Sequence, residues 1–251
     1  MTQYAMVIDL HKCTGCGACA MACKTGNNTA NRSSGQTHNW ADYQAEVSGK
    51  FPNVKYTMRP VLCNHCTDAP CVEACPVEPK AMYKTKDGIT MHNDDRCIGC
   101  RACQEACPYS RMEVTGNEYS VISYNEEGQP YMPEFADKTE MIPGGTTSGA
   151  ELAARAGDNP PHRTAYDHPD YRDVRRDNIV EKCIFCEHLV KNGELPNCVV
   201  ACPCQARTFG DMQDKNSDVA QLLQNYRGTV LKPEEGTSPN VFYIREYKVS
   251  A

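Results

Sequence analysis

The feature that most constrains this chain is a run of cysteines over residues 97–108, which reads C-I-G-C-R-A-C-Q-E-A-C-P. Three cysteines at three-residue spacing, then a fourth four residues later and followed by proline, form the ligand run typical of bacterial iron–sulfur clusters. The small residues Gly99 and Ala102 allow the backbone to wrap closely around one cluster. Cys107 lies past this loop, where a helix start would direct it toward a second cluster.

Three further runs of the same kind argue against a chance match to the iron–sulfur ligand pattern. The first run lacks the usual proline and has Lys24 in its place, while the other runs end in cysteine–proline. The second run has two more residues between its middle cysteines than the run at 97–107, and the fourth has eleven residues between its middle cysteines. The four runs are Cys13, Cys16, Cys19 and Cys23; Cys63, Cys66, Cys71 and Cys75; Cys97, Cys100, Cys103 and Cys107; and Cys183, Cys186, Cys198 and Cys202.

Seventeen cysteines in 251 residues also fit two other classes of protein. A secreted protein with many disulfides is one, but clustered C-x-x-C pairs suit metal ligation better than the closure of long loops. Zinc ribbons are the other, but they need two cysteine pairs per metal rather than repeated four-cysteine runs. Iron–sulfur clusters explain the pattern best.

The charge of the chain argues against a nucleic-acid partner. The formal net charge is −6, and an oxidised 4Fe–4S core with four thiolates adds about −2 per site, so four sites bring the total to roughly −14. Such a surface repels phosphate backbones. Lys12, Arg96 and Lys182 each precede the first cysteine of a run, and they are either local counter-charges for a cluster or ordinary solvated residues.

The N-terminal part predicts a strand and then a loop. Residues 5–10 are apolar and lead into Cys13, which indicates a short strand rather than a signal peptide, because no basic segment precedes them. Residues 25–57 are polar and rich in Asn, Ser and Gly, which predicts a loop. Trp40, the only tryptophan, lies in this segment and is interpreted as a packing anchor.

The middle of the chain predicts a hairpin and a long insertion. Residues 81–85 and 89–92 flank Lys-Asp-Gly, which is typical of a β-hairpin, so residues 63–108 resemble one two-cluster ferredoxin unit with a repeated β-α-β order. Residues 109–180 contain no cysteine and many turn-forming residues, which predicts a surface insertion with a helix near residues 150–156. Its aromatic and basic residues suit either a subunit contact or a solvated loop: Tyr166, Tyr171, Arg172, Arg175 and Arg176.

The C-terminal part predicts three short elements around the last cysteines. Residues 206–209 suit a strand, residues 219–226 an amphipathic helix, and residues 241–247 a closing strand. No apolar run approaches the roughly 18 residues that cross a bilayer, so no direct membrane span is expected. The paired arginines at 175–176 are internal and are not an export signal.

The runs predict how sixteen thiolates divide among four clusters. In a two-cluster unit the fourth cysteine of one run ligates the cluster of the other run. Runs two and three are adjacent and should pair, which leaves runs one and four to pair across them. The expected sets are Cys13, Cys16, Cys19 and Cys202 for cluster 1; Cys23, Cys183, Cys186 and Cys198 for cluster 2; Cys63, Cys66, Cys71 and Cys107 for cluster 3; and Cys75, Cys97, Cys100 and Cys103 for cluster 4.

Three residues beside the runs need an interpretation of their own. Cys204 is left over from the runs and is expected to pack near cluster 1 as a small buried side chain, with a reactive thiol as the alternative. His65 and His188 lie between or just after ligands. Because each run is already complete, they are expected to donate hydrogen bonds to a cluster site rather than to bind iron.

The four runs, with their flanking residues, resemble the four-cluster iron–sulfur subunit of the dimethyl sulfoxide reductase superfamily of molybdopterin oxidoreductases. The resemblance covers roughly residues 1–115 and 178–251. Some relatives carry tryptophan at the position of Cys100 and hold a 3Fe–4S cluster, whereas the cysteine here implies four 4Fe–4S clusters. The matching stretches are D-L-H-K-C-T-G-C-G-A-C-A-M-A-C-K, L-C-N-H-C-T-D-A-P-C-V-E-A-C-P, D-D-R-C-I-G-C-R-A-C-Q-E-A-C-P-Y and E-K-C-I-F-C-E-H. The segment G-T-S-P-N-V-F-Y-I-R is most similar to arsenate, polysulfide and tetrathionate reductase subunits, with arsenate favoured.

The resemblance implies an α+β fold with two ferredoxin-like (βαββαβ) 4Fe–4S units, pseudo-two-fold symmetry and a long loop-rich insertion. The expected units are residues 1–57 with 178–251, and residues 58–115, with residues 116–177 as the insertion and a subunit contact. It also implies a non-catalytic electron-transfer subunit that relays electrons between a quinol-side or cytochrome partner and a molybdopterin catalytic subunit. By family analogy, cluster 1 faces the molybdenum subunit and cluster 4 lies toward the donor.

Three alternatives stay open at this stage. The chain could be a free polyferredoxin, although the insertion is not needed for that role, or a catalytic subunit whose clusters are structural. The resemblance further implies export to the periplasm together with a catalytic partner that bears the twin-arginine signal, with a cytoplasmic location as the alternative.

Overall fold

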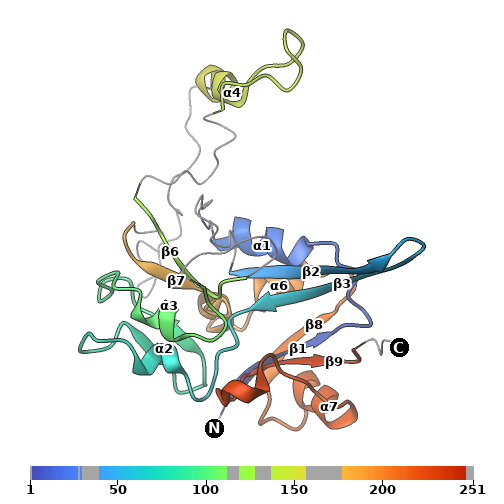
Figure 1. Cartoon of the computed structure of the whole chain (residues 1–251). Helices are drawn as coiled ribbons and strands as arrows, with labels where there is room; N and C mark the ends of the chain where they lie inside the picture. The colour runs from blue at the N-terminus through green and yellow to red at the C-terminus, as the bar shows by residue number, and fades with distance from the viewer. Residues whose placement is uncertain are drawn as a thin grey trace.

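The computed structural model describes residues 2–27, 29, 40–111, 119–127, 137–156 and 177–246. Its three-stranded sheet is centred on β1 (Tyr4–Asp9), which confirms the predicted N-terminal strand. β1 pairs antiparallel with β8 (Arg207–Asp211) and parallel with β9 (Val241–Ile244). The sheet therefore joins the beginning of the described chain to its end, and Figure 1 shows the three strands side by side.

Both faces of β1 are buried, because its alternate residues pack into two different cores. Ala5 and Val7 contact Val219 of helix α7 (Asp218–Asn225), while Met6 and Ile8 join the large core that contains most of the buried cysteines. The hydroxyl of Ser217 accepts a hydrogen bond from the amide of Ala220 at 3.1 Å, which caps the start of α7. The predicted C-terminal helix and strands are confirmed.

The predicted loop over residues 25–57 is wrong for residues 25–27 and 40–57, while residues 28 and 30–39 lie outside the described residues. The helix α1 (Ala18–Asn27) reaches into this segment, and β2 (Ala41–Lys50) then pairs with β3 (Asn53–Leu62) in a long antiparallel hairpin. Most side chains of the hairpin are at least partly exposed, so its strands are held by their mutual backbone pairing and carry little of the apolar alternation that marks a buried strand. The expected unit boundary between residues 57 and 58 falls inside β3.

The second and third cysteine runs surround a small hairpin, as predicted. β4 (Met82–Lys84) pairs with β5 (Thr90–His92), and the turn between them contains Gly88 at φ +86°. Two short helices, α2 (Pro70–Glu73) and α3 (Ala102–Ala106), contact one another beside this hairpin.

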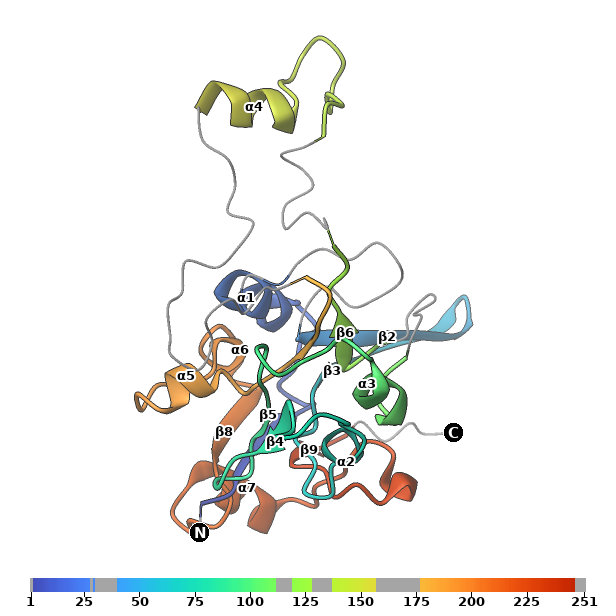
Figure 2. The ribbon, with the colours of Figure 1, turned by 90° about the vertical axis from the view of Figure 1, so that its left-hand side faces the viewer.

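The predicted insertion over residues 109–180 is only partly a surface segment. β6 (Ile122–Tyr124) pairs with β7 (Val180–Lys182), and Ile122 is fully buried, because an apolar side chain here completes the core beneath the cysteine runs. In contrast, the predicted helix near residues 150–156 forms as α4 (Gly149–Ala156) without a buried residue. Figures 1 and 2 both show α4 apart from the rest of the molecule. The aromatic and basic residues singled out at positions 166–176 lie outside the described residues.

Three short elements complete the described chain. They are α5 (Glu187–Val190), α6 (Asn197–Val200) and the 3-10 helix η2 (Pro233–Glu235). α5 and α6 connect the cysteines of run four, and α6 contacts α1, which carries part of run one. Among the described residues, no helix is long and apolar enough to cross a membrane.

Candidate iron–sulfur site

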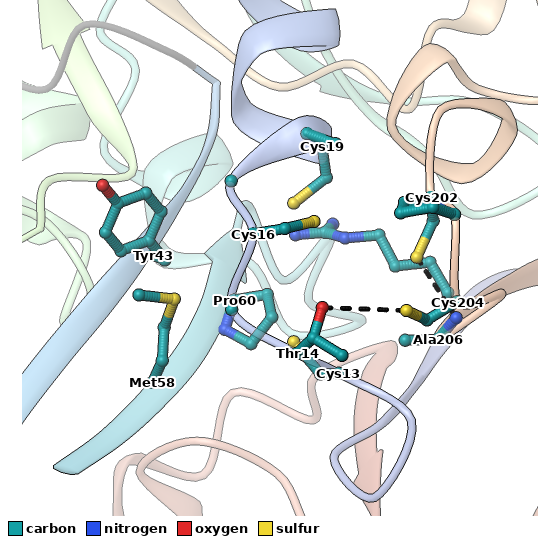
Figure 3. A pocket seen from close by; sticks show the side chains of 15 residues that line it. Cys13, Thr14, Cys16, Cys19, Tyr43, Met58, Pro60, Cys202, Cys204 and Ala206 are labelled. Carbon is teal, nitrogen blue, oxygen red and sulfur yellow. Dashed lines mark hydrogen bonds between the residues drawn. The ribbon is translucent and has the colours of Figure 1, made fainter.

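The first expected ligand set lines one cavity beside the β2–β3 hairpin. Cys13, Cys16 and Cys19 come from the loop after β1 and the start of α1, and Cys202 follows α6. Figure 3 shows these four side chains around a common space. The amide of Ala206 donates to the Cys202 sulfur at 3.2 Å, so this sulfur already has one donor from the protein backbone.

The third and fourth expected sets each line a cavity of their own. Cys63, Cys66, Cys71 and Cys107 surround one cavity together with Lys182. Cys75, Cys97, Cys100 and Cys103 surround another, next to His92. In both cavities a cysteine of one run lies among cysteines of the other run, Cys107 in the first and Cys75 in the second.

The second expected set is the most deeply enclosed. Cys23, Cys183, Cys186 and Cys198 are all buried. Burial raises the pKa of the Cys23 thiol, and the nearby sulfurs of Cys186 and Cys198 raise it further. The side-chain amide of Asn27 donates to Cys23 at 3.5 Å and lies 4.0 Å from the sulfur of Cys186. The structure thus brings together the cysteines of all four expected sets.

The donor chemistry of these groups suits a cubane cluster. All seventeen cysteines lie among the described residues, and none forms a disulfide. Burial raises the pKa of Cys66 to about 11 and that of Cys71 to about 12, so a charge on these sulfurs needs compensation by iron. Backbone amides supply part of the remaining stabilisation: the amides of His65, Gly99 and Phe185 donate to the sulfurs of Cys63, Cys97 and Cys183 at 3.5, 3.4 and 3.4 Å.

Cys97 departs from this trend. Burial raises the pKa of its thiol, but the hydrogen bond and charge of His92, together with backbone hydrogen bonds from Val180 and Gly99, outweigh that effect, and the net pKa is lowered. His92 is held by Asp94, since its Nδ1 lies 2.9 Å from a carboxylate oxygen of that residue. His92 was not singled out from the sequence, although its position five residues before Cys97 places it at the end of β5.

The same backbone geometry recurs in all four C-x-x-C loops. The residue before the second cysteine has a positive φ in each: Gly15 at +70°, His65 at +45°, Gly99 at +68° and Phe185 at +54°. Glycine adopts this conformation freely, whereas other residues occupy it at a cost of about 1–2 kcal/mol. A Cβ on Gly99 would lie 2.2 Å from the carbonyl oxygen of Asn178, so glycine is required there for space as well.

Neighbouring groups are connected through individual sulfurs. The charge of Cys19 acts on Cys198, that of Cys63 on Cys183, and that of Cys71 on Cys103, each raising the pKa of its neighbour. These electrostatic interactions link group 1 to group 2, group 2 to group 3 and group 3 to group 4. Only the two outer groups contain an exposed cysteine, Cys16 in the first and Cys100 in the last.

The other residues singled out from the sequence divide between core and surface. Lys12 and Arg96 are exposed, but Lys182 is buried, and its ammonium donates to the carbonyl of Cys183 at 2.8 Å. Trp40 is buried in the core, as expected of a packing residue. Cys204 is half-buried beside the first group, 3.7 Å from the hydroxyl of Thr14.

The two histidines are both buried. His65 accepts a hydrogen bond at Nδ1 from the amide of Thr90, at 3.1 Å. Its Nε2 is buried and has no hydrogen-bond partner among the residues that the structure describes, which leaves a donor for a cluster site. His188 lies on α5 next to the second group. His65 thus fits the predicted role of a hydrogen-bond donor.

Comparison with known proteins agrees with this donor set. Models of the 4Fe-4S dicluster domain match residues 12–79, and residues 54–122 and 162–212. The chain is 44% identical to the arsenate respiratory reductase iron-sulfur subunit of Shewanella sp. (strain ANA-3), over 98% of each chain. This chain belongs to the family of iron–sulfur subunits of the dimethyl sulfoxide reductase superfamily.

Other members of the family are similar over most of this chain as well. A selenate reductase subunit of Mesobacillus selenatarsenatis is 35% identical, with 96% of this chain and 72% of the relative covered. A tetrathionate reductase subunit of Salmonella typhimurium is 33% identical with the same coverage. Two dicluster domains correspond to four 4Fe–4S clusters. The protein is an electron-transfer subunit and not an enzyme on its own.

Proposed function

We propose that this subunit relays single electrons along four clusters in line, between a quinol-side donor and a molybdopterin catalytic subunit. The observation that carries the proposal is the order of the four cysteine groups, with an exposed ligand only at Cys16 and Cys100. Electron transfer weakens steeply with distance, so electrons enter and leave most readily at clusters near the surface. The two buried inner clusters then act as intermediate electron carriers.

Each cluster is held by the set of cysteines that surrounds one group. The sixteen ligands form two units with pseudo-two-fold symmetry, because in each unit one cysteine of a run joins the cluster of the other run. Support comes from Cys202 beside Cys13 and from Cys107 beside Cys63. When bound, the clusters supply reversible one-electron chemistry, and the protein spaces them and sets their potentials through hydrogen bonds, charge and burial.

The two ends of the relay have different partners. Cluster 1, at Cys16, faces the molybdopterin subunit, and cluster 4, at Cys100, faces the donor, which is a membrane quinol-oxidising subunit or a cytochrome. The insertion around α4 and the C-terminal segment bind the catalytic subunit. The shared interface exceeds the roughly 1,600 Å² of a standard interface, as is usual for permanent complexes.

Arsenate is the favoured terminal substrate of the complex, because an arsenate respiratory reductase subunit is 44% identical to this chain over 98% of its length. The complex works in the periplasm, to which this subunit is exported with its catalytic partner. A free polyferredoxin is the second candidate, and the exposed α4 counts against it, since collisional exchange does not need such a segment.

Anaerobic affinity purification of the tagged chain from its native host tests this proposal. We expect a large molybdenum-containing subunit to copurify, and arsenate to oxidise a reduced viologen dye only in the presence of that subunit. Tetrathionate and selenate serve as comparison substrates. A stable monomeric chain without a large partner, or arsenate turnover by the isolated chain, would overturn the proposal.

A further inference from the structure

Arg207 is a buried cation without an acidic partner. It is the first residue of β8, it is 3% exposed, and it forms no ion pair with a carboxylate among the described residues. One terminal nitrogen, Nη1, lies 3.6 Å from the sulfur of Met6, and the other, Nη2, is buried and forms no hydrogen bond within the part of the chain that the structure describes. A charge in this environment is costly unless other groups compensate for it.

The groups that interact with the Arg207 charge are cysteine sulfurs of two different clusters, together with the phenol of Tyr243. Its side chain lines the cavity of the first group, and its charge interacts with Cys13 and Cys19 there. The same guanidinium interacts with Cys198 of the second group, where burial raises the pKa of the thiol and Arg207 opposes that rise. Arg207 therefore lies between the first and second groups, at the point where Cys19 and Cys198 approach each other.

Charge balance gives this position a consequence for electron transfer. A 4Fe–4S core with four thiolates carries about −2 when oxidised and about −3 after it accepts one electron. Two such clusters side by side repel each other's added electron, and a buried cation between them favours the reduced form of both. Arginine suits this role because its charge persists at any relevant pH, and its planar head has donors on several sides.

We propose that Arg207 is the shared charge-compensating residue of clusters 1 and 2, which favours the reduced state of both and so sets the potentials at the end of the relay. The inference rests on the ligand sets given under the proposed function. The electron moves between clusters only, and Arg207 neither gains nor loses an electron or a proton. Nη2, which forms no hydrogen bond by distance and angle among the described residues, is placed to donate to a cluster sulfide or a ligand thiolate.

The test is an anaerobic redox titration of the holoprotein in its complex, followed by electron paramagnetic resonance. The signals are first assigned with one Cys→Ser variant in each group. The variants are Arg207→Met, which removes the charge, Arg207→Lys, which keeps it, and Arg155→Met as the matched control. Arg155 lies on α4, 66% exposed and paired with Glu151, so the control removes the same charge far from the clusters.

For Arg207→Met we expect the ratio of reduced to oxidised clusters at a fixed potential to fall at least tenfold for clusters 1 and 2, a shift of about 59 mV each. Clusters 3 and 4 should change less. Arg207→Lys should retain most of the wild-type ratio, and Arg155→Met all of it. Unchanged potentials in a fully loaded Arg207→Met variant would overturn the inference, as would equal shifts in all four clusters.

If Arg207→Met loses iron, the variant Arg207→Gln is measured as well. Its side chain is also neutral but retains a polar end. If both neutral variants lose iron and Arg207→Lys does not, the charge itself is needed for the two sites, which supports charge compensation. If Arg207→Lys loses iron as well, the side chain has a packing role and the inference fails. An error in the proposed ligand sets can be recognised separately. It would appear in the Cys→Ser variants of the protein that retains Arg207.

Discussion

The imidazole of His65 stacks on the ring of Phe185, with the ring centroids 3.6 Å apart and the ring planes at 20°. Each residue occupies the position before the second cysteine in a C-x-x-C loop, where the other two loops have glycine. The positive φ of both residues is therefore offset by a contact that glycine could not make. The stack joins cluster group 3 to cluster group 2, and so the two proposed units to each other.

Replacing Phe185 should destabilise the protein strongly. Phe185 is 1% exposed, and truncation of a buried phenylalanine costs about 3–5 kcal/mol because a cavity remains. We expect Phe185→Ala to lower the free energy of unfolding by that amount, measured by anaerobic urea denaturation and circular dichroism. Phe51→Ala is the control, since Phe51 is 92% exposed and its loss should change the free energy by less than about 0.5 kcal/mol. Equal effects of the two substitutions would contradict the packing role of the stack.

Cys202→Ser should affect cluster 1 and spare the cluster of its own run. Because Cys202 lies with Cys13, Cys16 and Cys19, we expect the paramagnetic signal of cluster 1 to change or disappear. Cys204→Ser is the control: this thiol borders the same cavity, yet it lies outside the ligand sets, so the iron content should stay near sixteen atoms per chain, about four for each cluster. Iron near eight atoms per wild-type chain, or bound zinc, would refute the cluster assignment, and so would a signal change confined to cluster 2.

Gly99→Ala should damage cluster 4. The new Cβ would lie 2.2 Å from the carbonyl oxygen of Asn178, and the backbone at φ +68° also disfavours alanine. We expect the variant to lose iron. We also expect its free energy of unfolding to fall by much more than the cost of placing alanine at a positive φ. Gly144→Ala isolates that cost, because Gly144 has a similar φ of +72° and open space around it. Its unfolding free energy should fall by only about 1–2 kcal/mol, and an equal loss in both variants would argue against the close contact.

Removing iron with a chelator under reducing conditions should unfold most of the described body. Cysteine side chains form a large part of the main core, and without iron the cavities that they line are left unfilled. We expect loss of tertiary structure by near-ultraviolet circular dichroism and rapid proteolysis around the cysteine runs. A chain that keeps cooperative unfolding after complete removal of iron would show that the clusters are not needed for the fold.

The sequence predicts the elements that adjoin the cysteine runs better than those that do not. Cysteine spacing fixes where the backbone must loop around a cluster, and the short apolar segments before and after each run then predict β1, β4, β5, β8 and β9. The β2–β3 hairpin is missed because Tyr43, Val47 and Tyr56 are all substantially exposed. An exposed strand pair has no buried face to produce alternation, and its backbone pairing leaves little trace in the sequence.

Long-range contacts limit what the sequence reveals about the site. Ile122 pairs with Lys182, and nothing in either local segment indicates the partner across the insertion. Arg207 is another case, because a single arginine in a predicted strand gives no sign that two cysteine groups meet around it. The stacking of His65 on Phe185 is also a long-range contact that the sequence does not reveal. An alignment of the four loops does show, however, that the two residues occupy equivalent positions.

The central position of β1 determines the order in which the chain can be completed on the ribosome. β1 is synthesised before every other described element, yet both of its neighbours, β8 and β9, emerge more than 190 residues later. The cysteines at 63–107 are synthesised, and can receive iron, while both edges of β1 are still unpaired. The proposed unit for clusters 1 and 2 therefore cannot close before residues 241–244 have been made.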